Sequence, residues 1–214
     1  MRIMLTCLIL LTPVIASAFV PTETVVSKPY EIVPIESASP EEVSFLGTLE
    51  NYPIMYEVTS EEAFTFKALL RQPTNQVPEP FSLLLIRRND RGGGVTEIAR
   101  ETIAPSEWSR TRDSLLGIGF LELPLSAELE PGIYRLEVSS PANKGQYALT
   151  IGQESKDVGY FEQLGYIRQT QSYFGYGFLT MLRSSLVYYP IGILLLLGAF
   201  YQTWRFASKR RSDA

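Results

Sequence analysis

An uncharged run next to the C-terminus, residues 186–204, limits what this chain can fold into more than any other feature of it. As an α-helix at ~1.5 Å per residue, this run measures about 28 Å, close to the hydrocarbon thickness of a bilayer. Aromatic rings that prefer the headgroup level of a membrane lie towards its two ends: Tyr188, Tyr189, Tyr201 and Trp204. We therefore predict one transmembrane helix over residues 186–204.

The ten residues that follow the run, 205–214, form a short basic tail. Its cations are Arg205, Lys209, Arg210 and Arg211. Because Lys and Arg accumulate on the cytoplasmic side of membrane spans, these residues set the topology and place the C-terminus in the cytoplasm. We expect a single-pass protein of the cell membrane, with the N-terminus outside and a tail too short to fold or catalyse.

The N-terminal residues 1–18 have the pattern of a secretory signal peptide. Arg2 precedes the apolar run 3–15, and small residues follow at Ala16-Ser17-Ala18. The alternative is an N-terminal anchor that is not cleaved. The chain contains no histidine, and its one cysteine, Cys7, lies within this segment. A mature chain without Cys or His excludes disulfides, thiolate nucleophiles, the usual zinc sites and a Ser-His-Asp triad, so we expect no metal site and no cofactor.

Charge differs between the two sides of the predicted span. Residues 19–158 contain 12 Lys and Arg against 21 Asp and Glu, a net charge of −9. An acidic surface repels polyanions, so nucleic acid is excluded as a partner. Adjacent carboxylates such as Glu41-Glu42 and Glu61-Glu62 point to opposite sides of an extended chain, which disfavours a carboxylate-based hydrolase.

The region outside the membrane has the pattern of an all-β domain. Residues 19–40 are rich in Pro, Ser, Thr and Glu and are predicted to be an extended leader. Short runs rich in β-branched and aromatic residues follow, and turn residues separate them. They are residues 43–49, 54–59, 64–72, 81–88, 95–100, 118–123, 132–139 and 146–151. With no long amphipathic helix between them, they predict a jelly-roll-like antiparallel β-sandwich over residues 41–153.

The last two of these runs carry a family resemblance. Residues 129–141, LEPGIYRLEVSSP, and 145–151, GQYALTI, contain a Pro-Gly-x-Tyr strand followed by a Gly-x-Tyr-x-Leu strand. This pair resembles the closing hairpin of bacterial pre-peptidase C-terminal domains, here in an arrangement similar to uncharacterised membrane-anchored bacterial proteins. The resemblance implies a β-sandwich. In that family the domain usually accompanies a catalytic domain, which is missing here, so no activity is implied.

Residues 154–185 are predicted to form an amphipathic juxtamembrane stalk. Apolar residues follow one another in steps of three, four and seven: Phe161, Leu164, Ile167, Phe174, Phe178 and Leu182. A helix places them on one face, which we expect to contact the bilayer or another membrane subunit. Arg168 and Arg183 are then positioned to reach lipid headgroups.

The most promising ligand surface lies in a loop-like stretch, residues 105–113. It contains Trp108, whose flat ring suits a sugar or peptide, with Arg110, Arg112 and Asp113 close by. The alternative is that Trp108 plugs the edge of the core while the charges are solvated.

Together these features predict a non-enzymatic membrane protein that presents a β-sandwich outside the cytoplasm as a binding or accessory module. Its expected partners are the lipid bilayer and either another membrane protein or an envelope glycan or peptide. A structural or assembly subunit of a larger membrane complex is the main alternative, and an envelope hydrolase is the weaker one.

Overall fold

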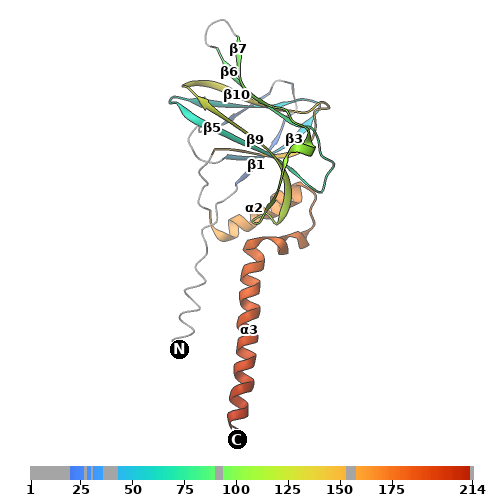
Figure 1. Ribbon diagram of the computed structural model, residues 1–214, viewed down its shortest axis with the longest axis vertical. Helices are drawn as coiled ribbons and strands as arrows, with labels where there is room; N and C mark the ends of the chain where they lie inside the picture. Colours follow the sequence, from blue (N-terminus) through green and yellow to red (C-terminus); the bar gives the residue numbers. More distant parts are fainter. Residues whose placement is uncertain are drawn as a thin grey trace.

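Two β-sheets face each other above one long helix, α3 (Ser185–Ser212), in the computed structural model (Figure 1). The structure describes residues 20–26, 28–29, 31–35, 43–89, 94–152 and 158–212, with side chains as far as Arg205. The predicted signal peptide, residues 1–18, lies outside the described residues, as do the side chains of Lys209, Arg210 and Arg211.

Each sheet is built from strands far apart in the sequence. The first has the order β1 (Pro21–Val25), β3 (Val43–Glu50), β11 (Lys144–Ile151), β5 (Phe64–Pro73), β9 (Ile118–Leu129) and β8 (Ser109–Asp113). The second has the order β2 (Ile32–Ile35), β4 (Ile54–Ser60), β10 (Gly132–Ser139), β6 (Ser82–Arg88) and β7 (Val95–Glu101). The β-sandwich with one C-terminal apolar helix is therefore confirmed, although the sheets are mixed: β1 pairs with β3, and β2 with β4, in parallel.

The predicted boundary between leader and sandwich at residues 40 and 41 is wrong. Strands β1 and β2 lie within residues 19–40 and extend one edge of each sheet. Proline, which cannot donate a ladder hydrogen bond, is tolerated in edge strands, and these two contain Pro21 and Pro34. Residues 20–26 and 31–35 therefore belong to the sandwich.

The core between the sheets follows the alternation of strand residues. In β4 the buried residues are Ile54, Tyr56 and Val58, and in β10 they are Tyr134, Leu136 and Val138. Tyr56 and Tyr147 are both buried and their hydroxyls lie 3.0 Å apart. Burial raises the pKa of both phenols, so both stay neutral at physiological pH.

A second apolar cluster joins the first sheet to helix α2 (Tyr160–Tyr173). It consists of Leu46, Leu116, Ile118, Phe120, Ala148, Ile167 and Phe174. The Phe120 and Phe174 rings meet edge to face, with their centroids 6.0 Å apart. Figure 1 shows α2 across the lower end of the sandwich, directly above the start of α3. The segment predicted to be an amphipathic juxtamembrane stalk thus contains a helix packed on the sandwich, followed by the 3₁₀ helix η2 (Phe178–Arg183).

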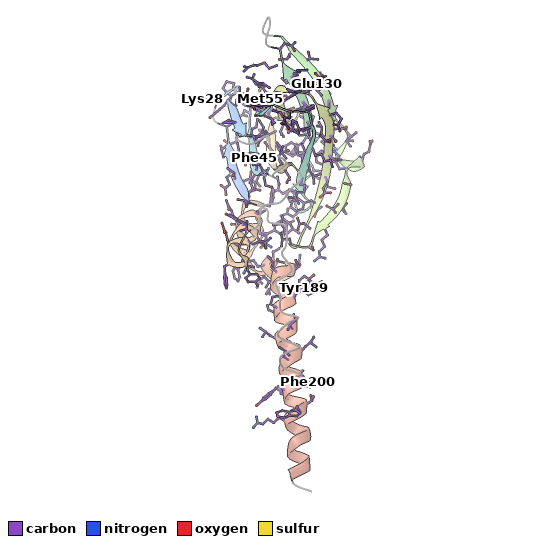
Figure 2. The ribbon with its side chains drawn as sticks, turned by 90° about the vertical axis from the view of Figure 1, so that its left-hand side faces the viewer. Lys28, Phe45, Met55, Glu130, Tyr189 and Phe200 are labelled. Atoms are coloured by element: carbon purple, nitrogen blue, oxygen red, sulfur yellow. The ribbon has the colours of Figure 1, made fainter. Side chains whose placement is uncertain are left out.

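Helix α3 extends away from the body as a single rod (Figure 2). Residues Ser185–Arg205 are long and apolar enough to cross a membrane, and none of that apolar stretch is buried inside the protein. Pro190 lies inside the helix and has no N–H to donate to the Leu186 carbonyl four residues earlier; that carbonyl instead accepts a hydrogen bond from the Tyr160 hydroxyl at 2.8 Å.

Candidate functional site

An open groove of about 820 Å³ lies at the end of the sandwich from which α3 leaves. We call it the arginine groove, after Arg110, Arg112 and Arg183 in its lining. Strands β8 and β9, the segment after β5 and the segment between α2 and η2 all contribute to it. Its other lining residues are Thr74, Asn75, Thr111, Gly117, Ile118, Gly119 and Tyr176.

Strand pairing positions the first two arginines. Arg110 lies opposite Leu121 and Arg112 opposite Gly119 in the antiparallel β8–β9 pair. Since side chains alternate along a strand, Arg110 and Arg112 share one face of β8. Gly119 places no side chain opposite Arg112, and a Cβ there would lie 2.8 Å from Thr74 Oγ1.

Gly117 allows the third arginine to approach. Its φ of +68° is a left-handed conformation that favours glycine in the β8–β9 turn. A Cβ at this position would lie 2.6 Å from the Arg183 carbonyl carbon. The backbone of Arg183 therefore packs directly on this turn.

Three hydrogen bonds connect the turn, α2 and α3. The Gln171 side-chain amide donates to the Leu116 carbonyl at 2.7 Å, and Asn75 donates to the Phe174 carbonyl at 3.1 Å. The Ser185 amide donates to the Ser114 carbonyl at 2.9 Å, at the first residue of α3. The groove is therefore attached to the base of α3 through backbone carbonyls.

Two of the four residues predicted to bind a ligand have structural roles instead. Trp108 is 5% exposed, packs in the core and donates from Nε1 to the Ile103 carbonyl at 3.0 Å. Its ring offers no free face to a sugar, so the alternative, a plug at the core edge, is correct. Asp113 accepts hydrogen bonds from Arg71 at 3.0 Å and from the Leu116 amide at 2.8 Å.

The two remaining predicted residues, Arg110 and Arg112, are exposed and line the groove together with Arg183. Within the described part of the chain, none of these three guanidinium groups forms an ion pair. The sequence did not point to Thr74 or Tyr176 as their neighbours.

Tyr176 adds a neutral hydroxyl to this basic surface. Burial raises the pKa of its phenol, although hydrogen bonds with Thr74 and Asn75 and the positive charge of Arg183 act in the opposite direction. The phenol therefore keeps its proton at neutral pH, and the groove offers hydrogen-bond donors to an anion.

The apolar residues predicted to form one contact face are divided between two environments. Ile167 and Phe174 are buried against the sandwich, so these two do not face a membrane or a partner, and the partly buried Leu164 packs beside them. Phe161, Phe178 and Leu182 are exposed. Leu179, not predicted, is 75% exposed. We call Phe161, Phe178, Leu179 and Leu182 the apolar collar.

No protein-family model matches the chain, and a search of curated proteins finds no match. Solved structures similar to it include the pre-peptidase C-terminal domain of a Bacillus anthracis collagenase, with 15% identity over 59% of this chain and 98% of that domain and a TM-score of 0.36. A mitogen from Yersinia pseudotuberculosis has 17% identity over 55% of this chain and 89% of its own, with a TM-score of 0.38. An Aeromonas hydrophila periplasmic inhibitor of g-type lysozyme has 12% identity over 62% of this chain and 98% of its own, with a TM-score of 0.35.

Likenesses this distant carry no conclusion about ligand or activity. They do include a pre-peptidase C-terminal domain, the family that the closing hairpin resembles.

Proposed function

We propose that this protein is a non-enzymatic, single-pass membrane protein that holds its β-sandwich at a fixed height outside the cytoplasm, as a binding or accessory module. One observation carries the proposal: no residue in the apolar stretch of α3 is buried inside the protein body, while the base of α3 is attached to the sandwich. Such a helix requires a lipid environment, and its attachment determines what the sandwich presents.

Hydrogen bonds add to the covalent backbone in attaching α3 to the sandwich. The Tyr160 hydroxyl on α2 donates to the Leu186 carbonyl at 2.8 Å, and the Ser185 amide donates to the Ser114 carbonyl. Ser184, between η2 and α3, is fully buried. Because α2 is itself packed against the first sheet, we expect the sandwich to keep its orientation relative to the membrane.

Charge supports the proposed topology. The tail adjoining α3 is basic, whereas residues 19–158 carry a net charge of −9. The positive-inside rule places such a tail in the cytoplasm and leaves the sandwich on the other side.

A binding role is favoured over catalysis by the residue types available. The chain has no histidine, and its one cysteine lies in the predicted signal peptide. General acid-base chemistry would therefore rest on carboxylates, lysines or tyrosines. Asp113, the acid nearest to the groove arginines in the sequence, is engaged by Arg71. This is the reason to prefer a module that binds over an envelope hydrolase.

Site-specific photo-crosslinking in cells, using the full chain, tests the function. A crosslinker replaces Val95 at the far end of the sandwich or Leu195 in α3, both of which are exposed. A defined crosslink from Val95 supports a binding module, and one from Leu195 alone supports the alternative of an assembly subunit. Hydrolytic turnover by the purified protein that is lost on a carboxylate substitution would overturn the non-enzymatic proposal.

A further inference from the structure

Three guanidinium groups gather at the end of the sandwich that faces the span, on a domain that is otherwise acidic. Arg110 and Arg112 come from β8 and Arg183 from the end of η2. All three are exposed, and in the residues the structure describes none forms an ion pair. By contrast, Arg71, on β5 at the other side of β9, is paired with Asp113.

The groove opens at the level where α3 begins. Tyr188 lies in the first turn of α3, and Arg112 is two residues before Ser114, whose carbonyl accepts the hydrogen bond from the amide of Ser185, the first residue of α3. Arg183 is two residues before the helix starts. Since Tyr residues at the end of a span lie at headgroup level, Arg112 and Arg183 are placed at that level as well.

Apolar side chains stand beside these cations. The apolar collar residues Phe178, Leu179 and Leu182 belong to the same short helix as Arg183 and are exposed. Arg168 fixes this segment, because its guanidinium lies 5.8 Å from the centre of the Phe178 ring and donates to the Tyr176 carbonyl at 3.1 Å. A ligand at this end of the protein therefore contacts cations and apolar surface together. An amphiphile with an anionic headgroup matches both.

We propose that the arginine groove binds the phosphate of an acidic phospholipid headgroup in the leaflet on the sandwich side, with the apolar collar in the adjacent acyl region. Guanidinium forks match phosphate oxygens, and the neutral Tyr176 hydroxyl adds a further donor beside them. The inference rests on the proposed membrane anchoring and adds a lipid class to it. It also explains why, among the described residues of an acidic domain, Arg110, Arg112 and Arg183 gather without ion pairs at the membrane end.

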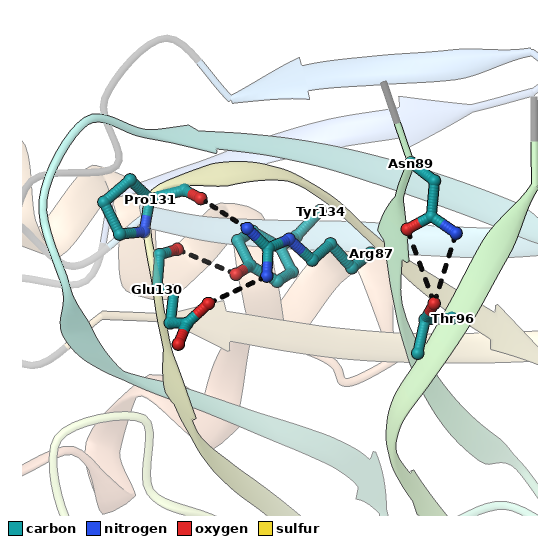
Figure 3. Close-up of polar contacts among 6 residues, drawn as sticks. All are labelled: Arg87, Asn89, Thr96, Glu130, Pro131 and Tyr134. Atoms are coloured by element: carbon teal, nitrogen blue, oxygen red, sulfur yellow. Dashed lines mark hydrogen bonds and ion pairs between the residues drawn. The ribbon is translucent and has the colours of Figure 1, made fainter. Parts of the chain in front are cut away.

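Native mass spectrometry of the detergent-solubilised full chain, titrated with phosphatidylglycerol or phosphatidylcholine, tests this. The test variant is Arg112→Gln/Arg183→Gln. The matched control is Arg87→Gln/Arg88→Gln, which removes the same charge at the far end of the sandwich, where β6 ends. Figure 3 shows Arg87 there, held by the Glu130 carboxylate at 3.0 Å and the Pro131 carbonyl at 2.9 Å.

We expect the wild type to prefer phosphatidylglycerol and the test variant to bind it roughly 25-fold more weakly, at about fivefold per arginine near an acidic lipid surface. The control variant should bind as the wild type does, and Arg112→Lys/Arg183→Lys should recover part of the affinity because the charge remains. If the test variant does not fold, Arg110→Gln in the edge strand β8 replaces it, with about a fivefold loss expected.

Equal binding by test and control variants would overturn the proposal. Displacement of the lipid by glycerol phosphate at the same concentration would also overturn it, because the site would then be one for a free phosphate. Failure of the chain to insert into bilayer nanodiscs would reject the proposed anchoring itself. Normal insertion without a preference for the acidic lipid would reject only the proposal that the arginine groove binds an acidic lipid.

Discussion

Replacement of Phe174 by Ala tests whether α2 is packed on the sandwich. The ring is 1% exposed and lies in the second apolar cluster, edge to face with Phe120. Removing a buried Phe side chain costs about 3–5 kcal/mol of the free energy of unfolding. For a protein of this size, that corresponds to a melting temperature lower by about 6–20 °C.

The assay is thermal unfolding of the full chain in detergent, followed by tryptophan fluorescence. The chain has two tryptophans, so a Trp204→Phe background leaves buried Trp108 as the reporter. Phe161→Ala is the matched control, because this ring lies on the same helix and is 84% exposed. We expect the control to change the free energy of unfolding by less than about 0.5 kcal/mol.

The reasoning would be refuted if Phe174→Ala unfolded at the same temperature as Phe161→Ala. That result would mean that the packing of α2 contributes nothing to the stability of the folded sandwich. A lower melting temperature accompanied by faster proteolysis near α2 would agree with the structure.

Three further predictions concern the body of the sandwich and α2. Gly47→Ala should lower the free energy of unfolding by about 1–3 kcal/mol, because its Cβ would overlap the buried Tyr147 ring. Gly165→Ala, in open space on α2, should raise the free energy of unfolding by about 0.5–1 kcal/mol. Urea titration measures both changes. Trp108→Ala should lower the free energy of unfolding by about 3–5 kcal/mol, and Trp108 fluorescence should not respond to added envelope glycans. Burial raises the pKa of Tyr173 from 10.0 to about 12. The contribution of its protonated phenol to stability is therefore complete below pH 10 and is lost as pH rises through 12. Across this pH range, the melting temperature of Tyr173→Phe should fall less steeply than that of the wild type.

Sequence patterns predicted the parts of the fold that depend on local order. An uncharged run predicts, by its length alone, a helix that could cross a membrane, and enrichment in β-branched and aromatic residues marked central strands such as β4 and β10. Strand β8, Ser-Arg-Thr-Arg-Asp, has the sequence pattern of a loop, because an edge strand with no fully buried residue shows no alternation of apolar and polar residues. Strands β1 and β2 were missed because their partners are β3 and β4, in parallel pairings that leave no local pattern.

Periodicity in the segment before the span identified apolar faces without identifying what covers them. Ile167 and Phe161 fit the same helical spacing, yet one is packed on the sandwich and the other is exposed. The sequence likewise does not show which distant residues meet at the arginine groove. Arg110 and Arg112 could be singled out as neighbours in sequence, but a chain turn and Gly117 bring Arg183 to them from a distant segment.

The depth of two labelled sites in a bilayer tests the central claim most directly. The full chain, with Cys7 replaced by Ser, carries one new cysteine at Leu179 or at Val95, both exposed and at opposite ends of the protein body. Each is labelled with an environment-sensitive dye in nanodiscs containing nitroxide lipids. We predict strong quenching at Leu179 and none at Val95. Equal quenching at the two sites, or quenching at Val95 alone, would contradict a sandwich held with its arginine groove against the membrane.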